Sequence, residues 1–125
     1  MERLVLPLLW SSALVFAVIG VFFLALPERA AASIGVVLSD ATARTDVRAT
    51  YGGMMLGTAL FFVWAALAPD RHTAGLWLML LMYGGLALGR VVAIAGGERP
   101  GAMMWSFLVI EFAVAVLSGL ALHKG

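Results

Sequence analysis

Three ionisable side chains lie within or at the margin of apolar segments: Arg48, Arg90 and Glu111. A charged group at the centre of a bilayer costs about 2.5–3.5 kcal/mol on insertion scales, and such groups usually face the bundle interior and pair. Glu111 lies about eight residues, or 12 Å, inside its segment, too deep for a carboxylate to reach the membrane surface. It must therefore be neutral, paired with Arg90 or in contact with a wet cavity.

We call the membrane surface that carries the N-terminus face A and the opposite surface face B. Glu111 lies nearer to face B, and further charges lie near the same face. Arg90 is about five residues, or 8 Å, from face B, and Asp46 and Arg48 open another segment there. Two acids and two bases thus converge, which predicts a polar site for a ligand or a proton. Two alternatives stay open: snorkelling of Arg48 and Arg90 to face B, and a purely structural Arg90–Glu111 ion pair.

Two similar motifs surround these charges, YGGMMLG at 51–57 and YGGLALG at 83–89. Both contain Gly-x-x-x-Gly, which permits two helices to approach closely. We predict helix packing at four glycines: Gly53, Gly57, Gly85 and Gly89. The hydroxyls of Tyr51 and Tyr83 could donate hydrogen bonds into a cavity at the site, although packing as aromatic side chains near the interface is their more ordinary role.

Several other chemistries find little support in the sequence. The chain has no cysteine, which removes disulfides, thiolate catalysis, Cys-ligated zinc and iron–sulfur clusters. The histidines, His72 and His123, lie outside the apolar segments, which argues against a bis-histidine haem. We predict no metal and no cofactor, and no nucleophile–base pair stands out. A net charge of +1 argues against a nucleic-acid partner.

The elements that hold these residues are membrane spans. Hydrophobic residues make up 63% of the chain and charged residues 12%, with a mean hydropathy of +1.04, whereas soluble domains are about 45–50% apolar and 25% charged. A span needs about 20 apolar residues, and four stretches qualify: 4–26, 47–68, 74–95 and 103–122. The sequence predicts an all-α fold, an integral membrane four-helix bundle in a single domain of residues 1–125.

The first connection differs from the others. Residues 28–38 (ERAAASIGVVL) predict a short interfacial helix, and a polar loop follows at 39–45. Thr45 is expected to cap the second span, with Asp46 in its first turn. Both termini lie on face A. The positive-inside count is nearly tied, and Arg3 favours a cytoplasmic face A.

Three motifs carry a family resemblance: D-V-R-A-T-Y-G-G at 46–53, G-L-A-L-G-R at 85–90 and G-x-x-P at 97–100. They resemble a bacterial family of small four-helix membrane proteins, a domain of unknown function that is loosely similar to the DoxX-like proteins. The resemblance covers about residues 44–111 and implies these signature positions: Arg48, Tyr51, Gly52, Gly53, Gly89, Arg90 and Glu111. Some DoxX-like proteins are membrane subunits in quinone-linked oxidation, but no residue here carries that role over.

The leading hypothesis is a non-catalytic or accessory protein of the bacterial inner membrane. It would bind an amphiphilic ligand (a lipid, a quinone or a hydrophobic metabolite), with an anionic or polar head at the arginines. One alternative is a proton-coupled small transporter, working as an oligomer through Glu111; small multidrug exporters, however, carry this acid in their first span, where this chain has only Glu2. A membrane-embedded enzyme, a homo-oligomer or a structural subunit bound to a membrane-protein partner are further alternatives.

Overall fold

The computed structural model describes residues 2–124, so the ends of the predicted domain, Met1 and Gly125, lie outside the described residues. Within that range the chain is all-α and contains no strand. Its elements in order are α1 (Glu2–Ala25), α2 (Pro27–Ser33), α3 (Ala41–Val47), the π-helical segment η1 (Arg48–Gly53), α4 (Met54–Ala66), the 3-10 turn η2 (Pro69–Arg71), α5 (His72–Ala95) and α6 (Ala102–Lys124).

Four helical stretches are long and apolar enough to cross a membrane: Glu2–Ala25, Ala41–Ala66, Pro69–Ala95 and Ala102–Lys124. The second of these joins α3, η1 and α4 into one continuous helix. The predicted four spans are therefore confirmed, and the chain is a membrane protein by the length and composition of its helices.

The second span begins earlier than predicted. Asp40 caps it, because a carboxylate oxygen of Asp40 accepts a hydrogen bond from the backbone N–H of Ala43 at 2.8 Å. The expectation of a Thr45 cap after a polar loop is wrong: Thr45 lies inside α3, and its hydroxyl donates to the carbonyl oxygen of Ala41. Asp is at least as good an N-cap as Thr, so the earlier cap extends the helix by about one and a half turns.

A short helix, α2, begins one residue before the segment 28–38 for which an interfacial helix was predicted, and it ends at Ser33. Gly35 follows with φ +80°, in the left-handed region that glycine adopts without strain. Ala30 and Ala31 are buried in a small cluster with Phe23 of α1. The position of α2 at a membrane interface stays a prediction.

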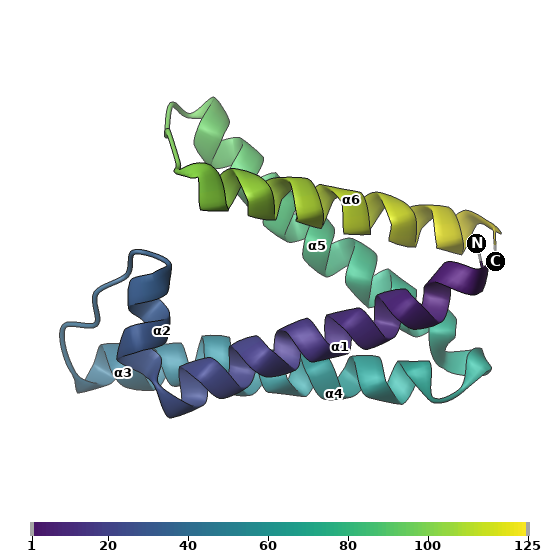
Figure 1. Cartoon of the computed structure of the whole chain (residues 1–125), viewed down its shortest axis with the longest axis horizontal. Helices are drawn as coiled ribbons and strands as arrows, with labels where there is room; N and C mark the ends of the chain where they lie inside the picture. Colours follow the sequence, from purple (N-terminus) through teal and green to yellow (C-terminus); the bar gives the residue numbers. More distant parts are fainter. Residues whose placement is uncertain (1, 125) are drawn as a thin grey trace.

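The spans form two antiparallel pairs rather than an evenly packed bundle (Figure 1). α1 lies along α4, and α5 lies along α6. Figure 1 shows that the pairs meet at the end where both chain termini lie, and diverge toward the end that carries α2 and α3. The first end corresponds to face A and the second to face B.

The main core lies where the two pairs meet. Its innermost side chains are Leu9 of α1, Phe62 of α4 and Met79 of α5, each fully buried. Phe16 of α1 links the pairs, since its ring centroid is 5.7 Å from that of Phe62 and 5.7 Å from that of Tyr83. Burial of large apolar side chains from three helices stabilises this junction.

Glycine determines the close approach of α1 and α4, but not at the predicted positions. A Cβ added at Gly20 would lie 2.9 Å from the carbonyl oxygen of Gly52 and 2.9 Å from the backbone nitrogen of Leu56. The predicted glycines do not pack in this way: an added Cβ meets nothing within 4 Å at Gly57, Gly85 or Gly89, and only the carbonyl oxygen of Arg48, at 3.9 Å, at Gly53. The prediction of a close crossing through them within one chain is wrong, because the second and third spans belong to different helix pairs and pack mainly against α1 and α6. In η1, Gly52 faces α1 and its neighbour Gly53 is exposed.

Candidate functional site

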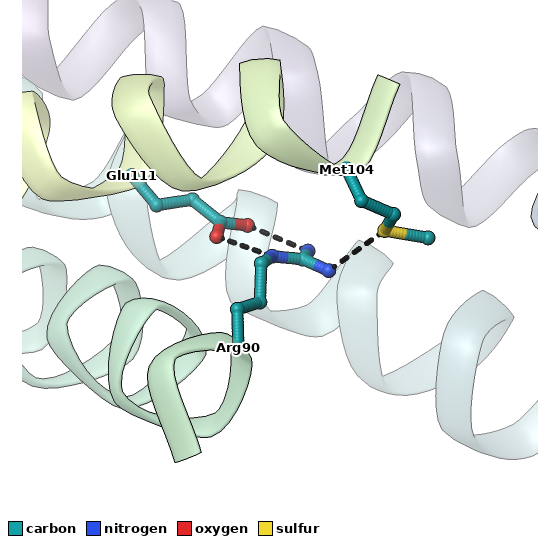
Figure 2. Close-up of polar contacts among 3 residues, drawn as sticks. All are labelled: Arg90, Met104 and Glu111. Atoms are coloured by element: carbon teal, nitrogen blue, oxygen red, sulfur yellow. Dashed lines mark hydrogen bonds and ion pairs between the residues drawn. The ribbon is translucent and has the colours of Figure 1, made fainter. Parts of the chain in front are cut away.

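Arg90 of α5 and Glu111 of α6 form a two-point ion pair (Figure 2). The Nε–H of Arg90 donates to Oε1 of Glu111 at 2.6 Å, and an Nη2–H donates to Oε2 at 2.8 Å. The two helices are joined by a short connection that includes Gly97, with φ +107°. Parallel N–H···O bonds of this kind combine charge attraction with a fixed geometry.

The surroundings of the pair are mostly apolar. The Nη1–H group of Arg90 donates to Sδ of Met104 at 3.1 Å, and the guanidinium lies 5.5 Å from the ring centroid of Phe107. The side chain of Arg90 is 26% exposed and that of Glu111 is 10% exposed. Each charge is therefore compensated inside the α5–α6 pair, and the accessible part of the site is mainly guanidinium.

An apolar groove of about 440 Å³ runs between α5 and α6. Small residues on both helices make room for it: Gly84 and Ala87 on α5, and Ala115 and Gly119 on α6. Ala87 is three residues from Arg90, and Ala115 is four residues from Glu111, spacings that place residues on one helix face. The groove therefore ends close to the ion pair: Val91 and Phe112, which line it, are the sequence neighbours of Arg90 and Glu111, although the paired side chains themselves are not among its lining residues.

The structure brings together two of the four predicted charges. Arg48 lies instead against α1, where its Nε–H donates to the carbonyl oxygen of Leu24 at 3.2 Å. That carbonyl belongs to the last turn of a helix, which lacks intrahelical donors. Asp46 is exposed beside a shallow depression on α3, and no hydrogen bond or ion pair of its side chain is found in residues 2–124. The divergence of the helix pairs at face B explains the separation of these groups from Arg90.

The two tyrosines occupy different environments. Tyr83 is buried, and its hydroxyl donates to Oγ of Ser12 at 3.1 Å. This bond joins α5 to α1 across the junction of the helix pairs. Tyr51 is 40% exposed, and its ring stacks on Phe23 with centroids 5.1 Å apart.

Sequence reasoning missed three features of the site. Met104 accepts a hydrogen bond from Nη1 of Arg90, a role that an ordinary apolar residue of a span does not announce. Ser12 accepts a hydrogen bond from the hydroxyl of Tyr83, and nothing in the sequence around Ser12 points to this partner. The π-helical turn at Arg48–Gly53 falls on the motif RATYGG; such turns are frequent at functional sites, and its paired glycines were the available signal.

Metal binding finds no geometric basis in the described part of the chain. No group of three or more His, Asp or Glu side chains there could hold an ion. The chemistry that the geometry offers is hydrogen bonding by a paired guanidinium next to an apolar groove.

Four helices long and apolar enough to cross a membrane, the last two of them joined by an ion pair, define a polytopic α-helical membrane protein. The chain belongs to the family described as Domain of unknown function (DUF4345), whose family model matches residues 6–122. Comparison with the curated proteins found no match, and comparison with the solved structures found none either. The resemblance to a membrane family of unknown function is confirmed, while the DoxX-like affinity and the bacterial origin stay predictions.

Proposed function

We propose that this protein binds one amphiphilic molecule along α5 and α6 and is not an enzyme. The tail of the ligand would lie in the apolar groove, and its head would lie at Arg90 and Glu111. The ligand classes are those that the sequence suggests: a lipid, a quinone or a hydrophobic metabolite. The observation that carries the proposal is that the groove lies between the same two helices that form the ion pair, and that two of its lining residues, Val91 and Phe112, are the sequence neighbours of Arg90 and Glu111.

The dimensions of the groove suit a single chain. It extends from Leu80 to Val91 along α5, about 16 Å at 1.5 Å per residue. Its volume of about 440 Å³ lies within the range of about 300–1,000 Å³ that is usual for small-molecule sites. Such sites are mostly apolar with a few polar groups that orient the ligand; the residues that line this groove are all apolar, and in this proposal the polar group is Arg90, next in sequence to the lining residue Val91.

The bonding of Glu111 supports binding over catalysis or proton exchange. Both carboxylate oxygens accept hydrogen bonds from Arg90, so general acid–base chemistry would first have to break the pair. The same argument weakens the alternative of a proton-coupled transporter. Proton release from proteoliposomes that depends on a cationic substrate, and that is absent in Glu111→Gln, would restore that alternative.

The cellular setting follows from the sequence and belongs to the same proposal. We place the protein in the inner membrane of a bacterium, as a DoxX-like accessory protein with both termini in the cytoplasm. The start of α1 and the end of α6 lie at the same end of the structure (Figure 1), as an even number of spans requires.

The test is native mass spectrometry of the protein extracted in mild detergent, with two glycine variants. Gly84→Leu fills the groove, whereas the control Gly85→Leu adds the same side chain one residue away, where an added Cβ meets nothing within 4 Å. We expect a discrete adduct on the wild type and on Gly85→Leu, and its loss from folded Gly84→Leu. A wild type without an adduct, or an adduct that survives in Gly84→Leu, would contradict the proposal.

A further inference from the structure

The bonding of the ion pair narrows the chemistry of the head group. We infer that the ligand has an uncharged head that presents acceptor oxygens, such as an ester or ketone carbonyl, rather than a carboxylate, a phosphate or an amine. This inference rests on the proposed function and names the ligand class for the same site.

The charge of the site is already balanced. Arg90 contributes one positive charge and Glu111 one negative charge, and two hydrogen bonds hold them together. An anionic head would meet a carboxylate as well as the guanidinium, and like charges repel strongly where water is scarce. If the anion displaced Glu111, a carboxylate that is 10% exposed would be left without its partner.

Arg48 of the second span cannot serve as a second cation for an anionic head unless it gives up its own hydrogen bond. Arg48 donates to the carbonyl oxygen of Leu24 on α1, and this places it in the other helix pair. The site therefore offers one cation that is already neutralised, which selects against an anion.

A cationic head group is disfavoured because Arg90, and not Glu111, is the more accessible member of the ion pair. The side chain of Arg90 is 26% exposed, compared with 10% for Glu111. An approaching amine would meet the guanidinium before it reached the carboxylate. The exposed chemistry is thus that of a hydrogen-bond donor, and its complement is an acceptor.

The guanidinium of Arg90 has N–H donors that the ion pair does not use. An arginine carries five N–H donors, and three of them are engaged here, with the two oxygens of Glu111 and with the sulfur of Met104. One N–H on Nη1 and one on Nη2 remain for a ligand. A thioether is a weak acceptor, so a carbonyl oxygen can also replace Met104 while the ion pair stays intact.

Four probes with the same sixteen-carbon chain test the head group: methyl hexadecanoate, hexadecanoate, hexadecylamine and hexadecane. Each is titrated at the same mole fraction in detergent, and its bound fraction is read by native mass spectrometry. We expect the methyl ester to bind at least tenfold more tightly than the other three. Met104→Leu, which removes the competing acceptor, should keep or increase this preference, whereas Arg90→Met with Glu111→Leu should abolish it.

The outcomes separate the two proposals. Tightest binding of hexadecanoate or hexadecylamine, or equal binding of all four probes, would overturn the inference about the head group and leave the groove as a binding site. Failure of every probe, together with a wild type that carries no native adduct, would overturn the proposed function itself.

Discussion

Arg90 and Glu111 hold α5 and α6 together through two hydrogen bonds of 2.6 and 2.8 Å, in a setting where both side chains are mostly withdrawn from solvent. Taking two charges out of water carries a large desolvation cost, which the pair offsets only while both members are present. The pair therefore fixes the register of the two helices more than it adds to stability. The contribution of the pair to stability can be measured separately from ligand binding.

Loss of one member of the pair should cost more than loss of both. Glu111→Leu leaves the guanidinium of Arg90 half-buried without a counter-ion, and we expect the free energy of unfolding in mixed micelles to fall by about 3 kcal/mol. The double variant Arg90→Met with Glu111→Leu should recover most of that loss. Arg99→Gln is the control, because Arg99 is exposed and, within residues 2–124, bonds only to the neighbouring carbonyl of Glu98. Equal destabilisation by the single and double variants would show that the pair is not coupled.

The approach of α1 to the second span should depend on one glycine and not on another. Gly20→Ala places a Cβ 2.9 Å from backbone atoms of Gly52 and Leu56, which cannot move aside as a side chain can. We expect it to lower the free energy of unfolding by about 1–3 kcal/mol through overpacking.

Gly57→Ala is the matched control for that substitution. Its Cβ would meet nothing within 4 Å, so it should be neutral, or stabilising by up to about 1 kcal/mol through helix propensity. Similar behaviour of the two variants in thermal unfolding would mean that α1 and α4 do not pack as described.

The hydrogen bond from Tyr83 to Ser12 should connect the two helix pairs energetically. Interhelical hydrogen bonds within membranes contribute about 0.6 kcal/mol on average, so Tyr83→Phe should have a small effect of that order. Ser12→Ala should cost a similar amount, and the double variant should cost no more than either single variant. An additive double-mutant cycle would be evidence that this 3.1 Å contact carries no coupling.

Local chemistry made much of the fold predictable from the sequence. Twenty-residue apolar runs allow few structures other than helices in lipid, because every backbone polar group must be satisfied within the segment. The Arg90–Glu111 pair was predictable for a related reason: a carboxylate deep in an apolar segment requires a partner, and Arg90 lay at a matching depth across a short connection.

The arrangement of the helices was not predictable in the same way. Gly-x-x-x-Gly permits close packing but does not say against which helix, and the close contact formed at Gly20 and Gly52 instead. The π-helical turn at Arg48–Gly53 shifts which residues face α1, and the paired glycines of RATYGG mark the place without specifying this kind of turn. The prediction that four charges cluster was wrong because it used only their depth in the membrane. Two side chains at equal depth are not neighbours when their helices diverge.

Substitution of Arg48 tests whether this residue is separate from the Arg90–Glu111 site. Its bond to the carbonyl oxygen of Leu24 places a cation at the C-terminal end of α1. There it satisfies a free carbonyl and interacts favourably with the partial negative charge at that end of the helix. Arg48→Gln should therefore lower the free energy of unfolding by less than about 1 kcal/mol and leave the native adduct and the preference for methyl hexadecanoate unchanged. Arg90→Gln should reduce both. If Arg48→Gln removed the adduct from a folded protein, the two arginines would share one ligand, and the helix pairs would have to close at face B when it binds.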